Sequence, residues 1–369
     1  MYKKILAVAV IAVIIVVIWY LEDQKTDVGI GGDSLADITL PTNNNTSMKE
    51  KKFPKAKEIV SPAGFINTDT LKVSGLIGKQ VILVDFWTYS CINCQRTLPY
   101  LNAWQEKYGD MGLTIIGVHT PEFEFEKKLA NVQAAVDKYD IAYPVVLDND
   151  YATWRAYGNR YWPRKYLIDI DGYIVYDHIG EGAYDETEGK IQELLTERSQ
   201  RLGEEKNIVK DMVKPVGAET VASNQARTPE IYFGSKRNEH LGNSKINQSG
   251  AINLSEDGQP QLDEFYLTGH WNITPEYSES QAAGAKITLR YRGQKVFFVA
   301  GSETKVQLKI TRDGQSLGAA RGSSVASDGT VTVVEEDLYR LVEDAVYGEH
   351  VLEIEAVGPG LRAFTFTFG

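Results

Sequence analysis

Apolar residues follow two different patterns along this chain, and the first pattern predicts an alternation of strands and helices. Residues 81–87, 113–119 and 144–148 are nearly unbroken apolar runs, which is typical of strands that are covered on both faces. Residues 96–107 and 126–139 lie between these runs and show a helical period. This order predicts a parallel sheet whose strands are joined by helical crossovers.

The end of this first part predicts a hairpin and a last helix. The dipeptide Asp171-Gly172 is a strong turn signal, and apolar segments at residues 165–170 and 173–179 flank it. Residues 185–202 are amphipathic and rich in charge, which predicts a helix. We therefore expect an α/β domain over residues 59–203, with a parallel core and one antiparallel hairpin.

The second pattern covers residues 228–369 and has a period of two. Apolar side chains alternate with polar ones, at Ile287, Leu289, Tyr291, Val306, Leu308, Ile310, Phe364, Phe366 and Phe368. Turn signals occur at Asp313-Gly314 and Asp328-Gly329. These features predict an all-β antiparallel sandwich, which a charged linker at residues 204–227 joins to the first part.

The first 22 residues have a composition of their own. Residues 5–21 carry no charge, two lysines precede them, and Glu22 and Asp23 follow. The run is nearly long enough to cross a membrane as a helix, and the lysines favour a cytoplasmic N-terminus with the bulk of the chain outside. We expect a single transmembrane anchor at residues 1–22, and a cleaved signal peptide is the alternative. Residues 23–58 are polar, lack a sustained period and are expected to be a linker.

Composition and charge narrow the choice of partner. The chain has 369 residues, of which 43% are hydrophobic, so two or three ordinary globular cores can form. Its formal net charge is -11. A negative field of this kind argues against a nucleic-acid backbone or an anionic membrane surface as the main partner.

The chain has two cysteines, Cys91 and Cys94, and both follow directly after the strand expected at residues 81–87. Cys91 falls where that strand ends and a helix begins, so the positive end of the helix favours its thiolate. Cys94 lies one helical turn later and can attack a mixed disulfide formed on Cys91. This arrangement predicts a redox-active pair that needs no further cofactor.

Two other interpretations of the cysteines are weaker. A zinc site needs two more ligands, yet there is no other cysteine and the five histidines do not cluster. A structural disulfide between residues three positions apart closes too small a loop to stabilise the fold much. We therefore expect no metal and assign the pair to thiol–disulfide exchange.

The sequence around the cysteines resembles a known family. The segment VILVDFWTYSCINCQRTLP at residues 81–99 resembles the active-site strand and helix of the thioredoxin superfamily. The segments GVHTPEFEFE, YPVVLDNDYATWRAYGNRYWPRKYLID and AFTFTFG are similar to the extracytoplasmic part of DipZ-type thiol–disulfide interchange proteins, within the TlpA-like group. The resemblance implies a thioredoxin-like domain followed by a jelly-roll module that looks like a carbohydrate-binding domain.

The resemblance also implies roles for single residues. Pro163 corresponds to a cis-proline that faces the cysteines, and Trp162 before it would present its backbone to a substrate; an ordinary trans proline is the alternative. Pro99 corresponds to a proline that kinks the active-site helix. Asp85 corresponds to an acid that assists proton movement at the second cysteine. Its place in an apolar strand, on the face of Trp87, also predicts a buried carboxyl group with a raised pKa, although such a group can simply satisfy a hydrogen bond.

Several neighbours of the cysteines are candidates for a supporting role. Tyr89 and Ser90 precede the first cysteine and are expected to shape substrate contacts and the local potential. His119 and Glu122 follow the next strand, at the sheet edge where the cysteines emerge, so either group can tune a thiolate. Trp87 belongs to the same set of tuning candidates. For His119, a hydrogen bond within the loop is the alternative.

The function that these features favour is a membrane-anchored, extracytoplasmic thiol–disulfide oxidoreductase that reduces or exchanges disulfides of envelope proteins. The resemblance suggests cytochrome c maturation as one such role. DipZ-type proteins carry a polytopic membrane domain, whereas this chain has one candidate span. We therefore expect a separate membrane reductase to supply its electrons, and a role as an oxidant is the alternative.

Two alternative functions stay open. The chain can be an envelope protein that binds a glycan or another protein, with a secondary redox domain; Trp271, Tyr277 and Tyr339 would then stack on a carbohydrate. A T-x-x-C pattern that ends at Cys91 weakly suggests a thiol peroxidase.

Overall fold

The computed structural model describes residues 49–219, 227–255 and 258–369. The anchor or signal peptide expected at residues 1–22 lies outside the described residues. Among the residues that the structure describes, no helix is long and apolar enough to cross a membrane. Residues Met48–Gly369 form one compact unit.

The first sheet has six strands in the order β1-β4-β3-β2-β5-β6. Their bounds are β1 (Gly64–Ile66), β2 (Val81–Trp87), β3 (Leu113–His119), β4 (Val145–Leu147), β5 (Arg164–Ile168) and β6 (Ile174–Ile179). Strands β2, β3 and β4 are parallel, whereas β1, β5 and β6 run antiparallel to their neighbours. The expected parallel core and hairpin are confirmed, and β1 is an additional strand that the apolar pattern did not predict.

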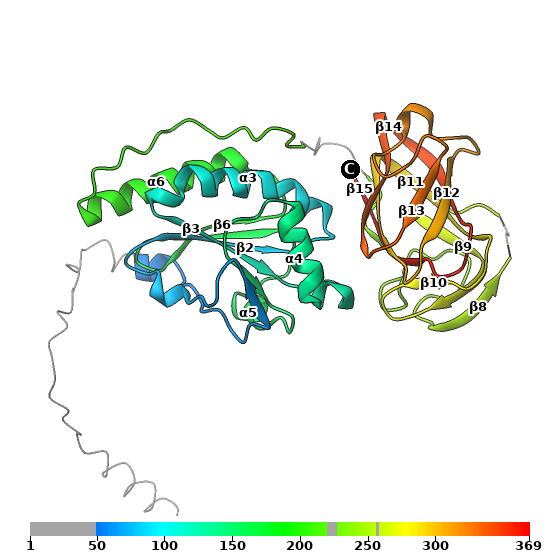
Figure 1. The fold of residues 1–369 in the computed structure, drawn as a ribbon, viewed down its shortest axis with the longest axis horizontal. Coiled ribbons are helices and arrows are strands. Elements are labelled where there is room, and N and C mark those ends of the chain that lie inside the picture. Colours follow the sequence, from blue (N-terminus) through cyan, green and yellow to red (C-terminus); the bar gives the residue numbers. More distant parts are fainter. Residues whose placement is uncertain (1–48, 220–226, 256–257) are drawn as a thin grey trace, which may run out of the picture. The chain divides into compact units, whose positions relative to one another are not determined.

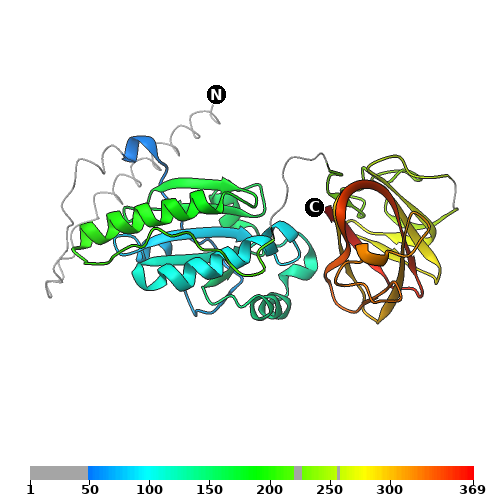
Figure 2. The same cartoon turned by 90° about the horizontal axis from the view of Figure 1, so that it is seen from above.

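The α-helices α3 (Ile92–Tyr108), α4 (Leu129–Lys138), α5 (Ala152–Ala156) and α6 (Tyr184–Leu202) accompany this sheet. Three short 3-10 helices also belong to this part, η1 (Val73–Gly75), η2 (Gly109–Met111) and η3 (Glu124–Lys127), whereas η4 (Gly318–Ala320) lies in the β domain. Helices α3 and α6 lie side by side on one face of the sheet, and α5 lies on the other face (Figures 1 and 2). Helix α3 begins at Ile92, earlier than expected, so both cysteines belong to its start.

Strand β2 is buried along its whole length, and its side chains enter two different cores. One core contains the helices α3, α4 and α6 together with Val81, Leu83 and Trp87. The other contains Ile82, Val84, Phe86 and the α5 side chain Trp154. Because successive side chains of a strand point to opposite faces, Asp85 belongs to the α3 face. A carboxyl group therefore enters this largely apolar core, as the period of two predicts.

In the described part of the C-terminal β domain there are nine antiparallel strands. They are β7 (Ile231–Tyr232), β8 (Gly250–Leu254), β9 (Glu264–Ile273), β10 (Ser278–Ser280), β11 (Ala285–Gly301), β12 (Val306–Arg312), β13 (Thr330–Val333), β14 (Asp337–Ala356) and β15 (Arg362–Phe368). The first half of β11 pairs with β9 and its second half pairs with β15. Strand β10 joins β9 to β15, so these strands surround a common apolar core.

Phe364 departs from the predicted pattern. The pairing of β11 with β15 shifts by one residue between Val299 and Ala300, which places Phe364 in a β-bulge. Its ring then packs against Phe123 and Phe125, whereas Phe366 and Phe368 stay in the β-domain core. Strict alternation would place all three phenylalanines on one face, and this prediction is wrong because a bulge turns Phe364 away.

The alternative of an aromatic platform for a carbohydrate does not hold for Trp271. Its ring is fully buried, and its Nε1–H donates to the carbonyl oxygen of Thr268 at 2.9 Å. Tyr277 is partly buried against Phe364, and the Tyr339 hydroxyl donates to a backbone carbonyl oxygen. A ring inside the core cannot stack on a sugar, because no sugar can reach its face.

Candidate active site

Cys91 and Cys94 lie at the start of α3, as the sequence predicts. Cys91 is the N-cap residue, and its extended backbone (φ -82°, ψ 117°) is the usual conformation for a residue that opens a helix. Both side chains are free thiols; Cys91 is partly exposed, whereas Cys94 is only 1% exposed. Cys94 lies in the first turn of α3, three residues after Cys91, and the two thiols interact electrostatically.

The surroundings of Cys94 keep it protonated. Burial raises the pKa of the Cys94 thiol well above its ordinary value, and the interaction with Cys91 acts in the same direction. A hydrogen bond with the backbone of Thr88 opposes this shift. Because the thiolate is the nucleophile in disulfide exchange, Cys94 needs a proton acceptor before it can attack.

Asp85 is a buried acid that interacts with Cys94. Its carboxyl group is 1% exposed, and it interacts electrostatically with Cys94. Burial raises the pKa of Asp85 to about 7, and the positive charge of Lys165 opposes the shift. Among the described residues, its Oδ1 atom has no hydrogen-bond partner. A carboxyl group that titrates near neutral pH suits general acid–base work.

The loop before Cys91, residues 88–90, is held by Glu126, which the sequence did not single out. The backbone N–H and the hydroxyl group of Ser90 donate to Glu126 Oε1, at 3.3 and 2.7 Å. The backbone N–H groups of Glu122 and Phe123 donate to Oε2, at 2.5 and 3.0 Å. One fully buried carboxyl group thus fixes two loops beside the cysteines.

Tyr89 and Ser90 support this loop from inside. Their side chains are 5% and 2% exposed, so neither presents a surface to a substrate. The ring of Tyr89 stacks on His119 with 5.7 Å between the ring centroids. Both side chains therefore stabilise the loop and do not lie on the surface, where the substrate contacts that we expected would form.

His119 is fully buried between the rings of Trp87 and Tyr89. Its Nε2 atom lies 3.4 Å from the hydroxyl oxygen of Thr88. Burial lowers the pKa of His119 to about 3. The imidazole is therefore neutral near pH 7 and cannot stabilise a thiolate by charge.

Glu122 is engaged elsewhere. Its Oε1 atom accepts hydrogen bonds from the hydroxyl group of Tyr232 at 2.8 Å and from Arg237 Nη1 at 2.7 Å. The Arg237 guanidinium also lies over the Tyr232 ring, 3.6 Å from its centroid. The charge of Glu122 is thus compensated by an arginine of the β domain.

Pro163 lies at the expected place. The Trp162–Pro163 peptide bond is cis, as the resemblance predicts. In the pairing of β2 with β5, Phe86 lies opposite Arg164, so Pro163 comes beside the end of β2 from which the cysteine loop departs. The ring of Trp162 is held by a hydrogen bond from Nε1 to the Thr120 carbonyl oxygen at 3.0 Å.

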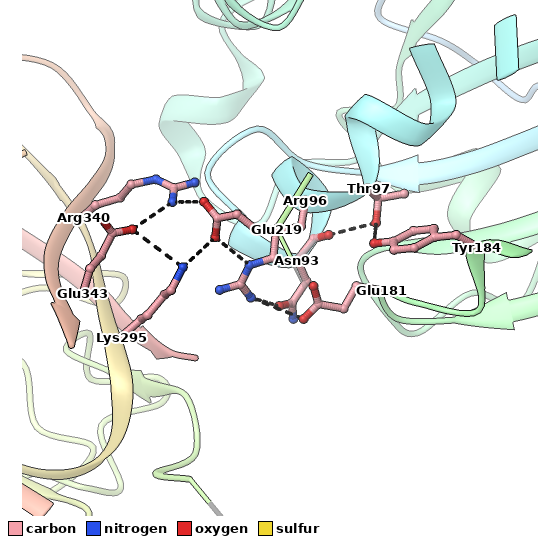
Figure 3. A network of polar contacts seen from close by, with 9 residues as sticks. All are labelled: Asn93, Arg96, Thr97, Glu181, Tyr184, Glu219, Lys295, Arg340 and Glu343. Carbon is pink, nitrogen blue, oxygen red and sulfur yellow. Dashed lines mark hydrogen bonds and ion pairs between the residues drawn. The ribbon is translucent and has the colours of Figure 1, made fainter. Parts of the chain in front are cut away.

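Arg96 anchors the beginning of α3. Its guanidinium is buried and forms ion pairs with Glu181 at 3.3 Å and with Glu219 at 3.5 Å (Figure 3). Glu219 also pairs with Lys295 and Arg340 of the β domain. The helix turn that carries Cys94 is therefore tied to the segment before α6 and to the linker.

Comparison with known proteins follows the same division of the chain. Residues 32–195 match the family described as Redoxin, and residues 228–369 match the family described as Thioredoxin like C-terminal domain. Protein DipZ of Mycobacterium bovis is 34% identical over 319 residues, covering 85% of this chain and 43% of DipZ, so the chain spans less than half of that relative.

Smaller relatives match the first part alone. The thiol-disulfide oxidoreductase ResA of Bacillus cereus is 32% identical over 134 residues, which cover 35% of this chain and 74% of ResA. Among solved structures, a thiol:disulfide interchange protein DsbE from Chlorobium tepidum is 26% identical, with a TM-score of 0.35 over 39% of this chain and 96% of that chain.

Proposed function

The chain belongs to the thioredoxin-like thiol–disulfide oxidoreductases and is DipZ-like in its two regions, and on this premise we propose that it exchanges disulfides with protein substrates outside the cytoplasm. The observation that carries the proposal is the cysteine pair itself. A partly exposed Cys91 caps a helix, and a buried Cys94 lies in the first turn of the same helix and interacts with it.

The proposed reaction proceeds in two exchanges. The Cys91 thiolate attacks one sulfur of a substrate disulfide, and the other substrate sulfur leaves with the electron pair. Cys94 then loses its proton and attacks Cys91, which breaks the mixed disulfide and releases the second substrate thiol. The substrate is reduced by two electrons and the Cys91–Cys94 pair is oxidised to a disulfide.

Asp85 is the proposed acceptor of the Cys94 proton, because it is buried beside Cys94 and its pKa is raised to about 7. Trp162 and Pro163 are the proposed substrate-binding edge. Their support is the position of Pro163 next to the end of β2, from which the cysteine loop departs.

We propose that the reaction runs in the reducing direction on envelope proteins, with cytochrome c maturation as one role. The oxidised pair then needs a reductant, which we assign to a separate membrane thiol reductase. The uncharged run at residues 5–21 is the proposed membrane anchor. These assignments rest on the family resemblance and on the composition of the N-terminus.

The test is reduction of insulin by the full chain with dithiothreitol as electron source. We expect Cys91→Ser to abolish turnover, because no nucleophile then meets the substrate. The matched variant Cys94→Ser keeps the first exchange and should accumulate a covalent mixed disulfide, visible on a non-reducing gel. Unchanged turnover in Cys91→Ser would reject the assignment.

A further inference from the structure

One buried charge has no role in the steps above. Lys165 in β5 is fully buried, and its Nζ atom donates to the carbonyl oxygen of Gly180 at 3.2 Å. In the antiparallel pairing of β2 with β5, Lys165 lies directly opposite Asp85. Side chains at paired positions point to the same face of a sheet. Both charged groups therefore enter the core beneath α3.

The burial of a charged lysine at this position needs an explanation. Burial of an ammonium group costs several kcal/mol unless other groups compensate its charge. Lys165 has three N–H donors, and Gly180 accepts from one of them. Burial lowers the pKa of Lys165, while Asp85, Cys94 and Glu181 raise it. The lysine thus interacts with both groups that take part in the second exchange.

The other neighbours of Lys165 do not take over this role. The titratable groups that face the pair are Cys94 of α3, Tyr143 before β4, His178 opposite Lys165 in β6, Glu181 after β6 and Tyr184 of α6, which has its ring centroid 5.7 Å from Nζ. Glu181 is paired with Arg96, and His178 Nε2 lies 3.2 Å from the Glu181 carbonyl oxygen. The Tyr143 hydroxyl has no hydrogen-bond partner among the described residues. Asp85 is therefore the acid that both interacts with Cys94 and feels the charge of Lys165.

We propose that Lys165 is a positioning residue whose positive charge keeps Asp85 ionised, so that Asp85 can accept the proton of Cys94 during the second exchange. This inference rests on the proposed function. The proton passes from the Cys94 sulfur to the Asp85 carboxylate, and the resulting thiolate attacks Cys91 and displaces the substrate sulfur. Lys165 keeps its own protons throughout.

Loss of this charge has a defined effect. Without Lys165, nothing opposes the effect of burial on Asp85, so the pKa of Asp85 rises further. The acid limb of the pH profile for the second exchange then moves to higher pH. An upward move of one pH unit makes this exchange about tenfold slower on the acid side of the limb.

The experiment separates the two exchanges. The reduced full chain is mixed with Ellman's reagent in a stopped-flow instrument across a pH series. Cys91 attacks the reagent and releases one thionitrobenzoate, and Cys94 then resolves the mixed disulfide and releases a second. The rate of the second release reports on Cys94, while the first release is an internal control.

Lys165→Met is the main variant, because methionine has a similar volume and no charge. Removal of one member of a buried charged pair strongly destabilises a fold, so the second exchange is compared only in variants that fold. Lys165→Gln is the second variant, to be used if the first does not fold. Lys72→Met removes an exposed lysine and controls for the change in net charge. We expect the acid limb of the second release to move up in the Lys165 variants and to stay in place in Lys72→Met.

A double variant tests the route of the effect. In an Asp85→Asn background, Lys165→Met should cause no further shift, because the lysine acts through the acid. The inference is overturned if the acid limb of the second release does not move in the folded Lys165 variants. It is also overturned if these variants slow the second release equally at every pH and still do so with Asp85→Asn. If the wild-type chain releases no second thionitrobenzoate, the proposed function itself fails, which is a different result.

Discussion

Replacement of Asp85 by asparagine should change how the stability of the fold depends on pH. In the unfolded chain an aspartate ionises at its ordinary pKa of about 3.9. In the folded chain, burial raises the pKa of Asp85 to about 7. Between these values the folded state holds a proton that the unfolded state has lost. The free energy of unfolding therefore falls as pH rises through this window and is level above it.

The size of the effect follows from the shift. The two pKa values differ by about 3 units, and each unit corresponds to 1.36 kcal/mol, so ionisation of Asp85 destabilises the wild-type fold by about 4 kcal/mol above pH 7. Asparagine does not ionise. Whatever constant offset the substitution adds, the difference in stability between Asp85→Asn and wild type should change by about 4 kcal/mol, in favour of the variant, from pH 4 to pH 8.

Urea unfolding of the reduced full chain at a series of pH values measures this difference. Asp69→Asn is the matched control, because Asp69 is exposed and its side chain stays in water on folding. We expect the free energy of unfolding, relative to wild type, to be the same at every pH for Asp69→Asn and to rise with pH for Asp85→Asn. If the difference in the free energy of unfolding between Asp85→Asn and wild type does not vary with pH, ionisation of Asp85 costs no free energy in the folded chain. The proton-acceptor role would then lose its physical basis.

Three further predictions concern the surroundings of the site. Glu126→Ala leaves buried N–H groups of Ser90 and Phe123 without an acceptor, so urea unfolding should show a loss of about 2–4 kcal/mol, and a loss below about 1 kcal/mol would contradict it. His119 has a pKa lowered to about 3, so its ring protons should not titrate by NMR between pH 5 and pH 8 in the folded chain, but should do so near pH 6.5 after unfolding. The stability that neutral His119 contributes is present above about pH 6.5 and is lost as pH falls. Trp271→Ala opens a cavity in the β domain and should cost about 3–5 kcal/mol, and a neutral result would place the ring outside the core.

The features that the sequence predicts correctly are those with a local signal. The apolar runs predict β2, β3 and β4 because each run is continuous and bounded by polar residues. The cysteine spacing predicts the thiol pair at the start of α3, since it needs only the strand that precedes it. The period of two predicts the burial of Asp85 for the same reason.

The features that the sequence does not reveal depend on contacts between distant segments. Glu126 bonds to Ser90 across 36 positions, and nothing in the neighbourhood of either residue signals this contact. Lys165 lies at an alternating position of β5, so its burial could have been inferred. Its pairing with Asp85, however, depends on the register of two strands. Phe364 turns away because of a bulge, which arises from the pairing of β15 and not from its own sequence.

The unequal exposure of the two sulfurs also makes this chain convenient to tag. A bulky maleimide can approach Cys91 but not Cys94, which is 1% exposed. One fluorophore would therefore attach at a known atom of the natural sequence, without any engineered cysteine. Its emission would then report directly on whatever polypeptide docks over the helix start.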